Sequence, residues 1–167
     1  MTAAEQQLIF QDWLERYRAI IFKIVRSYAS TASDQDDLFQ EIVIQVWRSI
    51  PAFRQASSVP TWLYRVSLNT AIKWTKKERK HTVLENIDQR LLQAPAGEMD
   101  ERLTWLYDAI HRLDKIDRSV ALLLLEGFSY KEMAAILGIT ESNVGVKINR
   151  IKKRLINQSK QGGCYGI

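Results

Sequence analysis

Residues 127–155 read GFSYKEMAAILGITESNVGVKINRIKKRL, and this stretch decides how the C-terminal part of the chain folds. Ser129 and Glu132 have the S-x-x-E spacing of a capping box, in which two helix-end amides are satisfied reciprocally. Gly138 stands where a helix needs a left-handed C-terminal residue, and Thr140 is a candidate N-cap for a second helix. The pattern predicts helix, glycine turn and helix, the arrangement that places a second helix in the DNA major groove.

The second predicted helix has two faces of different character. At about 3.6 residues per turn, its apolar face is predicted to pack in a core and consists of Val144, Ile148, Ile151 and Leu155. The other side is small, polar and basic, and its candidate DNA-binding residues are Ser142, Asn143, Val146, Lys147, Asn149, Arg150 and Lys153. Amides and cations can bond base edges, and an apolar side chain can touch a thymine methyl group. Two helices of an ordinary helical domain remain an alternative for this stretch.

Length and composition allow one ordinary domain or two small ones. The chain has 167 residues, and its 7 Gly and 3 Pro argue against a fold rich in strands and turns. Residues 1–81 hold 12 basic and 8 acidic side chains, residues 82–101 hold 1 and 5, and residues 102–167 hold 11 and 6. Two basic modules therefore flank an acidic connector, and basic modules suggest a polyanionic partner such as nucleic acid.

The sequence predicts a soluble cytoplasmic protein. Cys164 is the single cysteine, so no internal disulfide can form and a reducing compartment is expected. The N-terminus has neither a basic start nor an uninterrupted apolar run, which predicts no signal peptide. No stretch is long enough to cross a membrane, and we expect no membrane insertion.

Two amphipathic helices are predicted in the N-terminal module. Residues 4–29 carry an apolar stripe expected in the core, made of Ile9, Trp13, Tyr17, Ile20, Ile24 and Tyr28. Residues 33–50, with Ser33 or Asp34 as N-cap, carry two apolar rows, Leu38, Ile42, Val46 and Ile50 beside Phe39, Val43 and Trp47. So wide a face fits either a fully buried helix or a partner-binding face bordered by Asp34, Asp37, Gln40 and Glu41.

A third predicted helix, residues 59–81, has one side suited to nucleic acid. This side holds an aromatic ring, an amide and a row of cations, namely Trp62, Arg65, Asn69, Lys73, Lys76 and Lys80. Lys77 and Arg79 add to the cations, against one acid, Glu78. In single-stranded or opened DNA, rings stack on bases and cations hold phosphates. A solvated, lysine-rich helix end is the alternative.

The fold class expected from these elements is all-α, with two small helical domains joined by an acidic linker. The Ala-Pro-Ala-Gly break at 94–97 and the acidic composition predict a linker at residues 82–101. The domains are then residues 1–81 and residues 102–160, the second containing the helix-turn-helix.

Two further helices are predicted within the C-terminal part, over residues 98–112 and 115–126. The apolar run from Val120 to Leu125 should be the buried centre of this module. Residues 159–167 are expected to fray.

In this order, the chain resembles the extracytoplasmic-function (ECF) group of bacterial RNA polymerase sigma factors, within the sigma-70 family. The stretches that carry the resemblance are DQDDLFQEIVIQVWRSIPAF (34–53), PTWLYRVSLNTAIKWTKKERK (60–80) and LLLLEGFSYKEMAAILGITESNVGVKINRIKKRL (122–155). The resemblance covers nearly the whole chain and implies a two-domain factor that binds core polymerase, opens the −10 promoter element and reads the −35 element. We expect no enzyme activity, no cofactor and no metal.

The resemblance also implies roles for particular residues. Contacts with the clamp coiled coil of the polymerase β′ subunit are expected from Asp34, Asp37, Leu38, Gln40, Glu41 and Trp47. Contacts with the −10 element are expected from Phe53, Trp62, Arg65, Asn69, Lys73, Lys76, Lys77 and Lys80. Phe53 and Asn69 fall where the family captures a flipped base, and Trp62 where an aromatic ring supports the melted edge.

The remaining expected partners also come from the resemblance. The C-terminal domain is expected to dock on the polymerase β flap while its helix-turn-helix binds promoter DNA. An anti-sigma factor is an expected inhibitor, and no obligate homo-oligomer is expected. The chain departs from the family at RQASSVPTW (54–62), where a glycine and an acid often precede the serines, and at Gly145, where a basic residue is common.

Two other classes of protein explain parts of the sequence. A stand-alone helix-turn-helix regulator explains residues 127–155 but gives the Trp62–Lys80 stripe no role. A nucleic-acid enzyme would need a catalytic group, and the acids Asp34, Asp36, Asp37 and Glu41 could in principle hold a divalent cation. At a helix N-terminus, we expect these acids to serve capping and partner contact instead.

Overall fold

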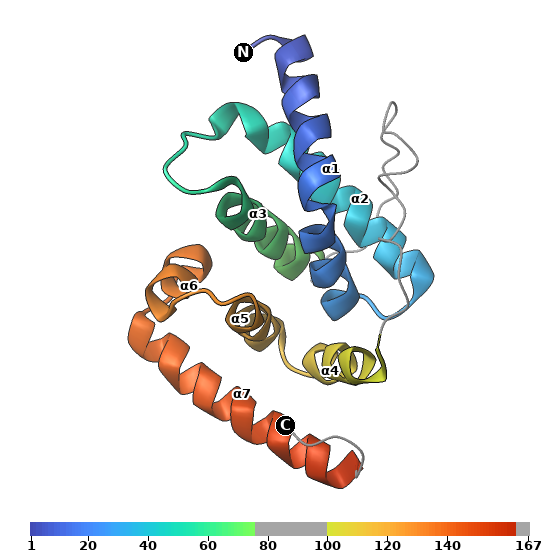
Figure 1. Ribbon diagram of the computed structural model, residues 1–167, viewed down its shortest axis with the longest axis vertical. Coiled ribbons are helices and arrows are strands. Elements are labelled where there is room, and N and C mark those ends of the chain that lie inside the picture. The colour runs from blue at the N-terminus through green and yellow to red at the C-terminus, as the bar shows by residue number, and fades with distance from the viewer. Residues whose placement is uncertain (76–99, 163–167) are drawn as a thin grey trace. The chain divides into compact units, whose positions relative to one another are not determined.

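The computed structural model describes residues 1–75 and 100–162, which belong to two separate compact units. The described residues contain helices and no strand, so the all-α prediction is confirmed (Figure 1). The N-terminal unit consists of α1 (Ala3–Tyr28), α2 (Ala32–Ser49), the short 3-10 helix η1 (Ile50–Ala52) and α3 (Val59–Trp74). The C-terminal unit consists of α4 (Glu101–His111), α5 (Lys115–Leu125), α6 (Tyr130–Leu137) and α7 (Glu141–Gly162).

Helices α1, α2 and α3 pack against one another, and α2 is buried along both of its apolar rows. Leu38, Ile42 and Val43 have no exposed surface, which explains the width of the apolar face: α2 contacts two helices rather than one. Its N-cap is Thr31, whose Oγ1 accepts from the Asp34 backbone N–H at 3.1 Å. The prediction of Ser33 or Asp34 as N-cap was therefore wrong.

Helix α1 buries a face beside the predicted one. Ile24 and Tyr28 of the predicted stripe are buried, but the rest of it is half-buried, and the other buried side chains include Phe10, Leu14, Ile21 and Val25. Because α1 contacts both α2 and α3, its buried side is centred between those two neighbours.

The helix-turn-helix prediction is confirmed by its end groups. Ser129 Oγ accepts from the Glu132 backbone N–H at 3.1 Å, and Glu132 Oε1 accepts from the Ser129 N–H at 3.2 Å. Gly138 has the left-handed φ of 70°, and Thr140 Oγ1 accepts from the Asn143 N–H at 3.0 Å. The capping box starts α6, and the contacts at Gly138 and Thr140 end α6 and start α7 across a turn of three residues.

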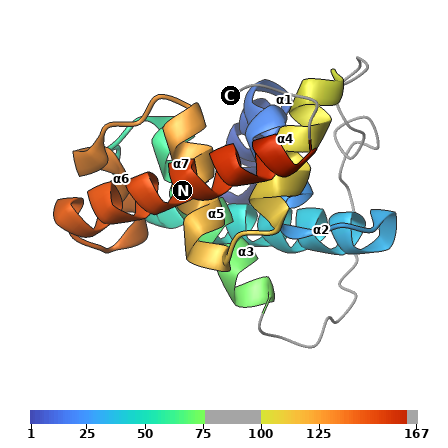
Figure 2. The same cartoon turned by 90° about the horizontal axis from the view of Figure 1, so that it is seen from below.

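The core of the C-terminal unit lies between α5, α6 and α7. Val144, Ile148 and Ile151 are buried as predicted, and α6 lies beside the N-terminal end of α7 (Figure 2). The run on α5 is buried from Val120 to Leu123, but Leu125 is exposed. Helix α7 continues to Gly162, so the expectation of fraying was wrong for residues 159–162, and residues 163–167 lie outside the described residues.

None of the helices within residues 1–75 and 100–162 has the length and apolar composition needed to cross a membrane.

Candidate functional site

A cluster of three aromatic rings joins α1, the segment after η1 and α3 in the N-terminal unit. Trp13 on α1, Phe53 directly after η1 and Trp62 on α3 are all half-buried. The ring centroids are 5.2 Å apart for Trp13–Phe53, 5.4 Å for Trp13–Trp62 and 5.3 Å for Phe53–Trp62. All three pairs meet edge to face, the arrangement that the aromatic quadrupole favours. We call these three residues the aromatic cluster.

Trp13 is the member that the sequence did not predict for this site. Its position on an apolar helical stripe favoured a core role, and its nearest cluster partner, Phe53, is 40 residues away along the chain. The high tryptophan content of the chain was the only signal in the sequence that an aromatic surface could include it.

The predicted nucleic-acid side of α3 begins at this cluster. Arg65, Asn69 and Lys73 are exposed and follow half-buried Trp62 at three- and four-residue steps, so they lie on one side of the helix. The opposite side is fixed in the core by Leu63, Tyr64, Leu68 and Ala71. The predicted contacts Lys76, Lys77 and Lys80 lie outside the described residues.

The loop between Phe53 and α3 is held at both ends. The Phe53 N–H donates to the Ile50 carbonyl at 3.0 Å, and Ser58 Oγ accepts from the Thr61 N–H at 3.3 Å as the N-cap of α3. Between them, Gln55 has φ 58°, a left-handed conformation that costs an L-residue about 1–2 kcal/mol. This strained residue lies in the segment where the chain departs from the glycine-containing family pattern.

The predicted polymerase-binding residues on α2 have different surroundings. Asp34, Asp37, Gln40 and Glu41 are half-buried and keep part of their surface exposed. Leu38 is 0% exposed, so this predicted contact is corrected: its side chain belongs to the core and cannot reach a partner.

Trp47, the last residue of that predicted set, is half-buried and joins α2 to α1. Its ring meets Phe10 edge-on at 5.2 Å, and its carbonyl accepts from Gln6 Nε2 at 2.7 Å. Trp47 therefore packs α2 against α1, whether or not it also contacts polymerase.

Helix α7 presents most of its predicted DNA-binding residues to solvent. Ser142, Asn143, Val146, Asn149 and Lys153 are exposed. Val146 is 62% exposed and is therefore open to contact with a partner.

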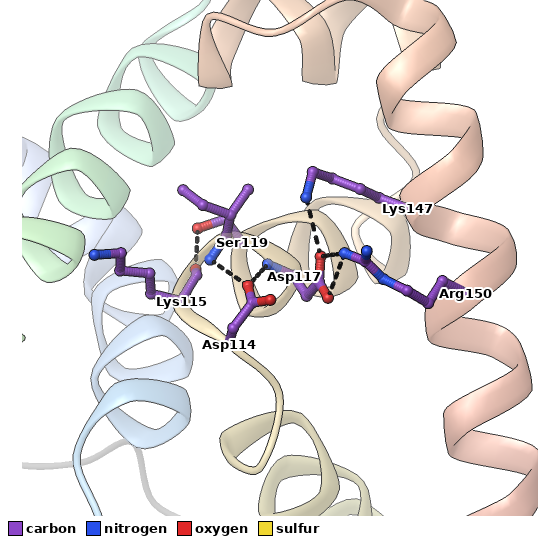
Figure 3. A network of polar contacts seen from close by, with 7 residues as sticks. Asp114, Lys115, Asp117, Ser119, Lys147 and Arg150 are labelled. Atoms are coloured by element: carbon purple, nitrogen blue, oxygen red, sulfur yellow. Dashed lines mark hydrogen bonds and ion pairs between the residues drawn. The ribbon is translucent and has the colours of Figure 1, made fainter.

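The other two predicted residues, Lys147 and Arg150, face an acid that the sequence did not single out. Asp117 on α5 has a fully buried side chain, and Lys147 and Arg150 reach it from α7 (Figure 3). Arg150 Nη2 lies 2.9 Å from both carboxylate oxygens, and Lys147 Nζ lies 3.4 Å from Oδ1. We call Asp117, Lys147 and Arg150 the α5–α7 ion network.

Asp114 adds a second acid at the start of α5. Its Oδ1 accepts from the backbone N–H groups of Ile116 at 3.1 Å and Asp117 at 2.9 Å. Desolvation raises the pKa of Asp114, but these two hydrogen bonds and the nearby charge of Lys147 together outweigh it, so the pKa lies below its usual value.

Across residues 1–75 and 100–162, no group of three or more His, Cys, Asp or Glu side chains is placed to hold a metal ion.

Two protein families match this chain in the order of its two units. Residues 13–81 match Sigma-70 region 2, and residues 103–155 match Sigma-70, region 4. The ECF RNA polymerase sigma-E factor of Haemophilus influenzae is 29% identical over 89% of this chain and 86% of its own length. The ECF RNA polymerase sigma factor SigX of Bacillus subtilis is 27% identical over 91% of this chain and 85% of its own length.

Two solved structures share the fold. The sigma factor RpoE of Bartonella quintana, solved with the anti-sigma factor NepR, has a TM-score of 0.62 and 20% identity over 94% of this chain and 96% of its own. CnrH, solved with the cytosolic domain of CnrY, has a TM-score of 0.64 and 22% identity over 95% of this chain and 91% of its own. With regions 2 and 4 both matched and ECF relatives aligned over most of their length, the chain belongs to the ECF group of sigma-70 family RNA polymerase sigma factors.

Proposed function

We propose that the N-terminal unit of this sigma factor binds core polymerase through the polar side of α2 and opens the −10 element at the aromatic cluster, while α7 reads the −35 element. The observation that carries the proposal is the half-exposed aromatic cluster at the head of the exposed Arg65–Asn69–Lys73 stripe. Rings beside an amide and cations suit an unstacked base with its phosphates.

Opening DNA in this way needs binding energy and no chemical step. Unstacking and unpairing one base costs a few kcal/mol, and one base stacked on an aromatic side chain returns about 1–3 kcal/mol. Asn69 supplies an amide that can donate to and accept from a base edge. Exposed Arg65 and Lys73 supply phosphate contacts that fix register and make binding salt-dependent.

The proposed −35 contacts are the exposed residues of α7. Asn149 and Ser142 can bond base edges, Val146 can contact a thymine methyl group, and Lys153 can reach a base or a phosphate. We expect Asn143, at the start of α7, to contact the phosphate backbone of the DNA.

Core RNA polymerase and promoter DNA are the partners of a sigma factor, and we expect docking on the β′ clamp coiled coil and the β flap. The two structural neighbours were solved with an anti-sigma factor or the cytosolic domain of another protein. By analogy, we expect an anti-sigma factor to bind this chain. We expect the chain itself to act in the cytoplasm, where polymerase works.

Run-off transcription with core polymerase on genomic fragments tests the function directly. We expect transcripts from a limited set of promoters that depend on the added chain. The free chain should bind these promoters weakly as duplex, and core polymerase should raise the affinity. Equal duplex binding with and without polymerase would instead support a stand-alone helix-turn-helix regulator.

The assignment of α7 is tested by Asn149→Ala and Lys153→Ala in holoenzyme. Each should weaken binding to a promoter with an intact −35 element and leave the affinity for core polymerase unchanged. Lys160→Ala is the matched control, because it removes an exposed cation near the other end of the same helix. Normal promoter binding by both test variants would contradict the assignment.

A further inference from the structure

The α5–α7 ion network contains the most deeply buried carboxylate of the C-terminal unit, and the contacts proposed above give it no role. Asp117 has a fully buried side chain, and its partners lie 30 and 33 residues further along the chain. A buried carboxylate needs charged partners to offset its desolvation. Here both partners come from the helix proposed to read DNA.

We propose that Asp117 is a positioning residue for −35 recognition, which holds Arg150 in place for a phosphate or base and removes Lys147 from the DNA-contacting set. This inference rests on the proposed function of α7. It gives different roles to Lys147 and Arg150, both of which the sequence predicted to contact DNA.

Arg150 keeps donors for a second partner. A guanidinium has five N–H groups, and Asp117 occupies only Nη2, which lies 2.9 Å from each carboxylate oxygen. The Arg150 side chain is 50% exposed, and its other nitrogens bond no residue within 1–75 and 100–162. An arginine held at one nitrogen loses less side-chain entropy when it binds a phosphate or guanine, because its direction is already set.

Lys147 is in the opposite situation. Its side chain is only 16% exposed, and its charge faces Asp117 at 3.4 Å as well as influencing Asp114. To reach a phosphate, its ammonium would have to leave two acids and the partly buried position between α5 and α7. We therefore expect Lys147 to contribute little to the salt dependence of promoter binding.

Asp117→Asn separates these roles because it removes the charge and preserves the shape. Lys147 is then free to move toward a phosphate, and Arg150 loses its fixed direction. The slope of log affinity against log salt should steepen by about 0.9 for each cation that gains a phosphate. The preference for an intact −35 element over a scrambled one should fall about tenfold, the size of one well-placed base contact.

The experiment uses holoenzyme assembled from core polymerase and the full chain. Two labelled fragments of one promoter, recovered by run-off transcription, share the −10 element and differ in an intact or scrambled −35 element. Affinity is measured by fluorescence anisotropy at several KCl concentrations. Asp108→Asn is the matched control, since Asp108 is an exposed acid on α4 of the same unit, and it should leave both preference and slope at wild-type values.

The outcomes separate the inference from the function on which it rests. Wild-type holoenzyme with no preference for the intact −35 element would overturn the proposed function of α7 itself. A clear wild-type preference that Asp117→Asn retains, with an unchanged salt slope, would overturn the inference alone. Equal loss of binding to both fragments would also overturn it, because a merely structural acid predicts that result.

Lys147→Met gives a test that does not depend on the Asp117 variant folding. It leaves the Arg150–Asp117 pair in place, so the −35 preference and the salt slope should both stay at wild-type values. A slope shallower by about one unit would show that Lys147 contacts a phosphate, and would overturn the division of roles.

Discussion

At the scale of single residues, the loop that leads into α3 contains a left-handed glutamine next to the aromatic cluster. Gln55 has φ 58°, where a side chain costs about 1–2 kcal/mol that glycine avoids. Glycine also lowers the stability of the fold by about 0.5–1 kcal/mol, because it has more conformational freedom in the unfolded chain. Gln55→Gly should therefore stabilise the N-terminal unit by up to about 1.5 kcal/mol.

Urea unfolding followed by tryptophan fluorescence measures this change, since four of the five tryptophans, Trp13, Trp47, Trp62 and Trp74, lie in the N-terminal unit. Gln55→Ala is the control, because it keeps the Cβ and so keeps the strain. If alanine and glycine raised the midpoint equally, strain at residue 55 would not be the cause.

Gly145 lies within α7, where a glycine either simply weakens the helix or allows a close approach to DNA. A Cβ there would lie 3.6 Å from a ring carbon of Tyr130, an ordinary van der Waals contact. Gly145→Ala should therefore stabilise the C-terminal unit by about 1 kcal/mol through helix propensity, without loss of promoter affinity.

Urea unfolding followed by circular dichroism measures the stability, and holoenzyme anisotropy measures the affinity. Gly138→Ala is the contrasting variant, since its φ of 70° is strained for alanine and should make it less stable. A large loss of promoter affinity in Gly145→Ala alone would favour the close approach to DNA.

At the scale of elements, the sequence predicted the ends of the helix-turn-helix correctly, whereas the N-cap of α2 and part of the face of α1 were predicted wrongly. Ser129, Glu132, Gly138 and Thr140 were assigned correctly because a cap is made by residues within four positions of each other. On α1, Ile24 and Tyr28 were assigned to the core correctly. The rest of the predicted stripe is only half-buried, because periodicity gives a direction for one neighbour and α1 packs against two.

The parts of the site that sequence analysis missed depend on contacts between distant segments. Asp117 and Arg150 are 33 residues apart, and neither helical pattern shows that an acid on α5 meets a cation on α7. Leu38 was assigned to a partner from the family resemblance of its helix, yet its apolar row is what a core between two helices requires.

The start of α5 should make the stability of the C-terminal unit depend on pH. The pKa of Asp114 is lower in the folded chain than its usual value of about 3.9. The carboxylate therefore stabilises the fold fully above that value, and the contribution is lost as pH falls through the folded pKa.

Asp114→Asn isolates this charge, because asparagine is also a good N-cap. The difference in unfolding free energy between wild type and variant should be largest near neutral pH and should shrink below about pH 4. Urea unfolding followed by circular dichroism from pH 7 to 3 measures it. A difference that stayed constant across this range would exclude Asp114 ionisation as its source.

We expect the aromatic cluster to contribute both to the stability of the N-terminal unit and to promoter opening. Trp13→Leu keeps an apolar side chain but removes two edge-to-face contacts, worth about 0.5–1.5 kcal/mol each. We expect lower stability of the N-terminal unit and weaker opening of the −10 element, since Phe53 and Trp62 lose a common support.

Permanganate reactivity of unpaired thymines in the holoenzyme–promoter complex measures opening. Phe10→Leu is the control, because it removes the Phe10–Trp47 contact in the same unit without touching the cluster. Equal loss of opening in both variants would mean that unit stability, rather than the cluster, limits the reaction.

At the scale of the whole molecule, the proposed function gives each of the two units its own DNA-contacting surface. Each has an excess of basic over acidic residues, and the segment between them is acidic. When polymerase holds both units on one promoter, the second contact forms at a high effective concentration. Each surface can then have modest affinity of its own, consistent with the few base-reading side chains on α7.

This organisation predicts how substitutions in the two units combine. Asn69 and Asn149 lie in separate compact units, so their losses of promoter-binding free energy should add within about 0.5 kcal/mol in holoenzyme carrying both alanine substitutions. Asn69→Ala with Lys73→Ala is the contrasting pair, because these neighbours on α3 would hold the same DNA segment and should combine non-additively. If the distant pair instead showed an interaction energy above about 1 kcal/mol, the two surfaces would have to act as one unit, and the separate roles proposed for them would be wrong.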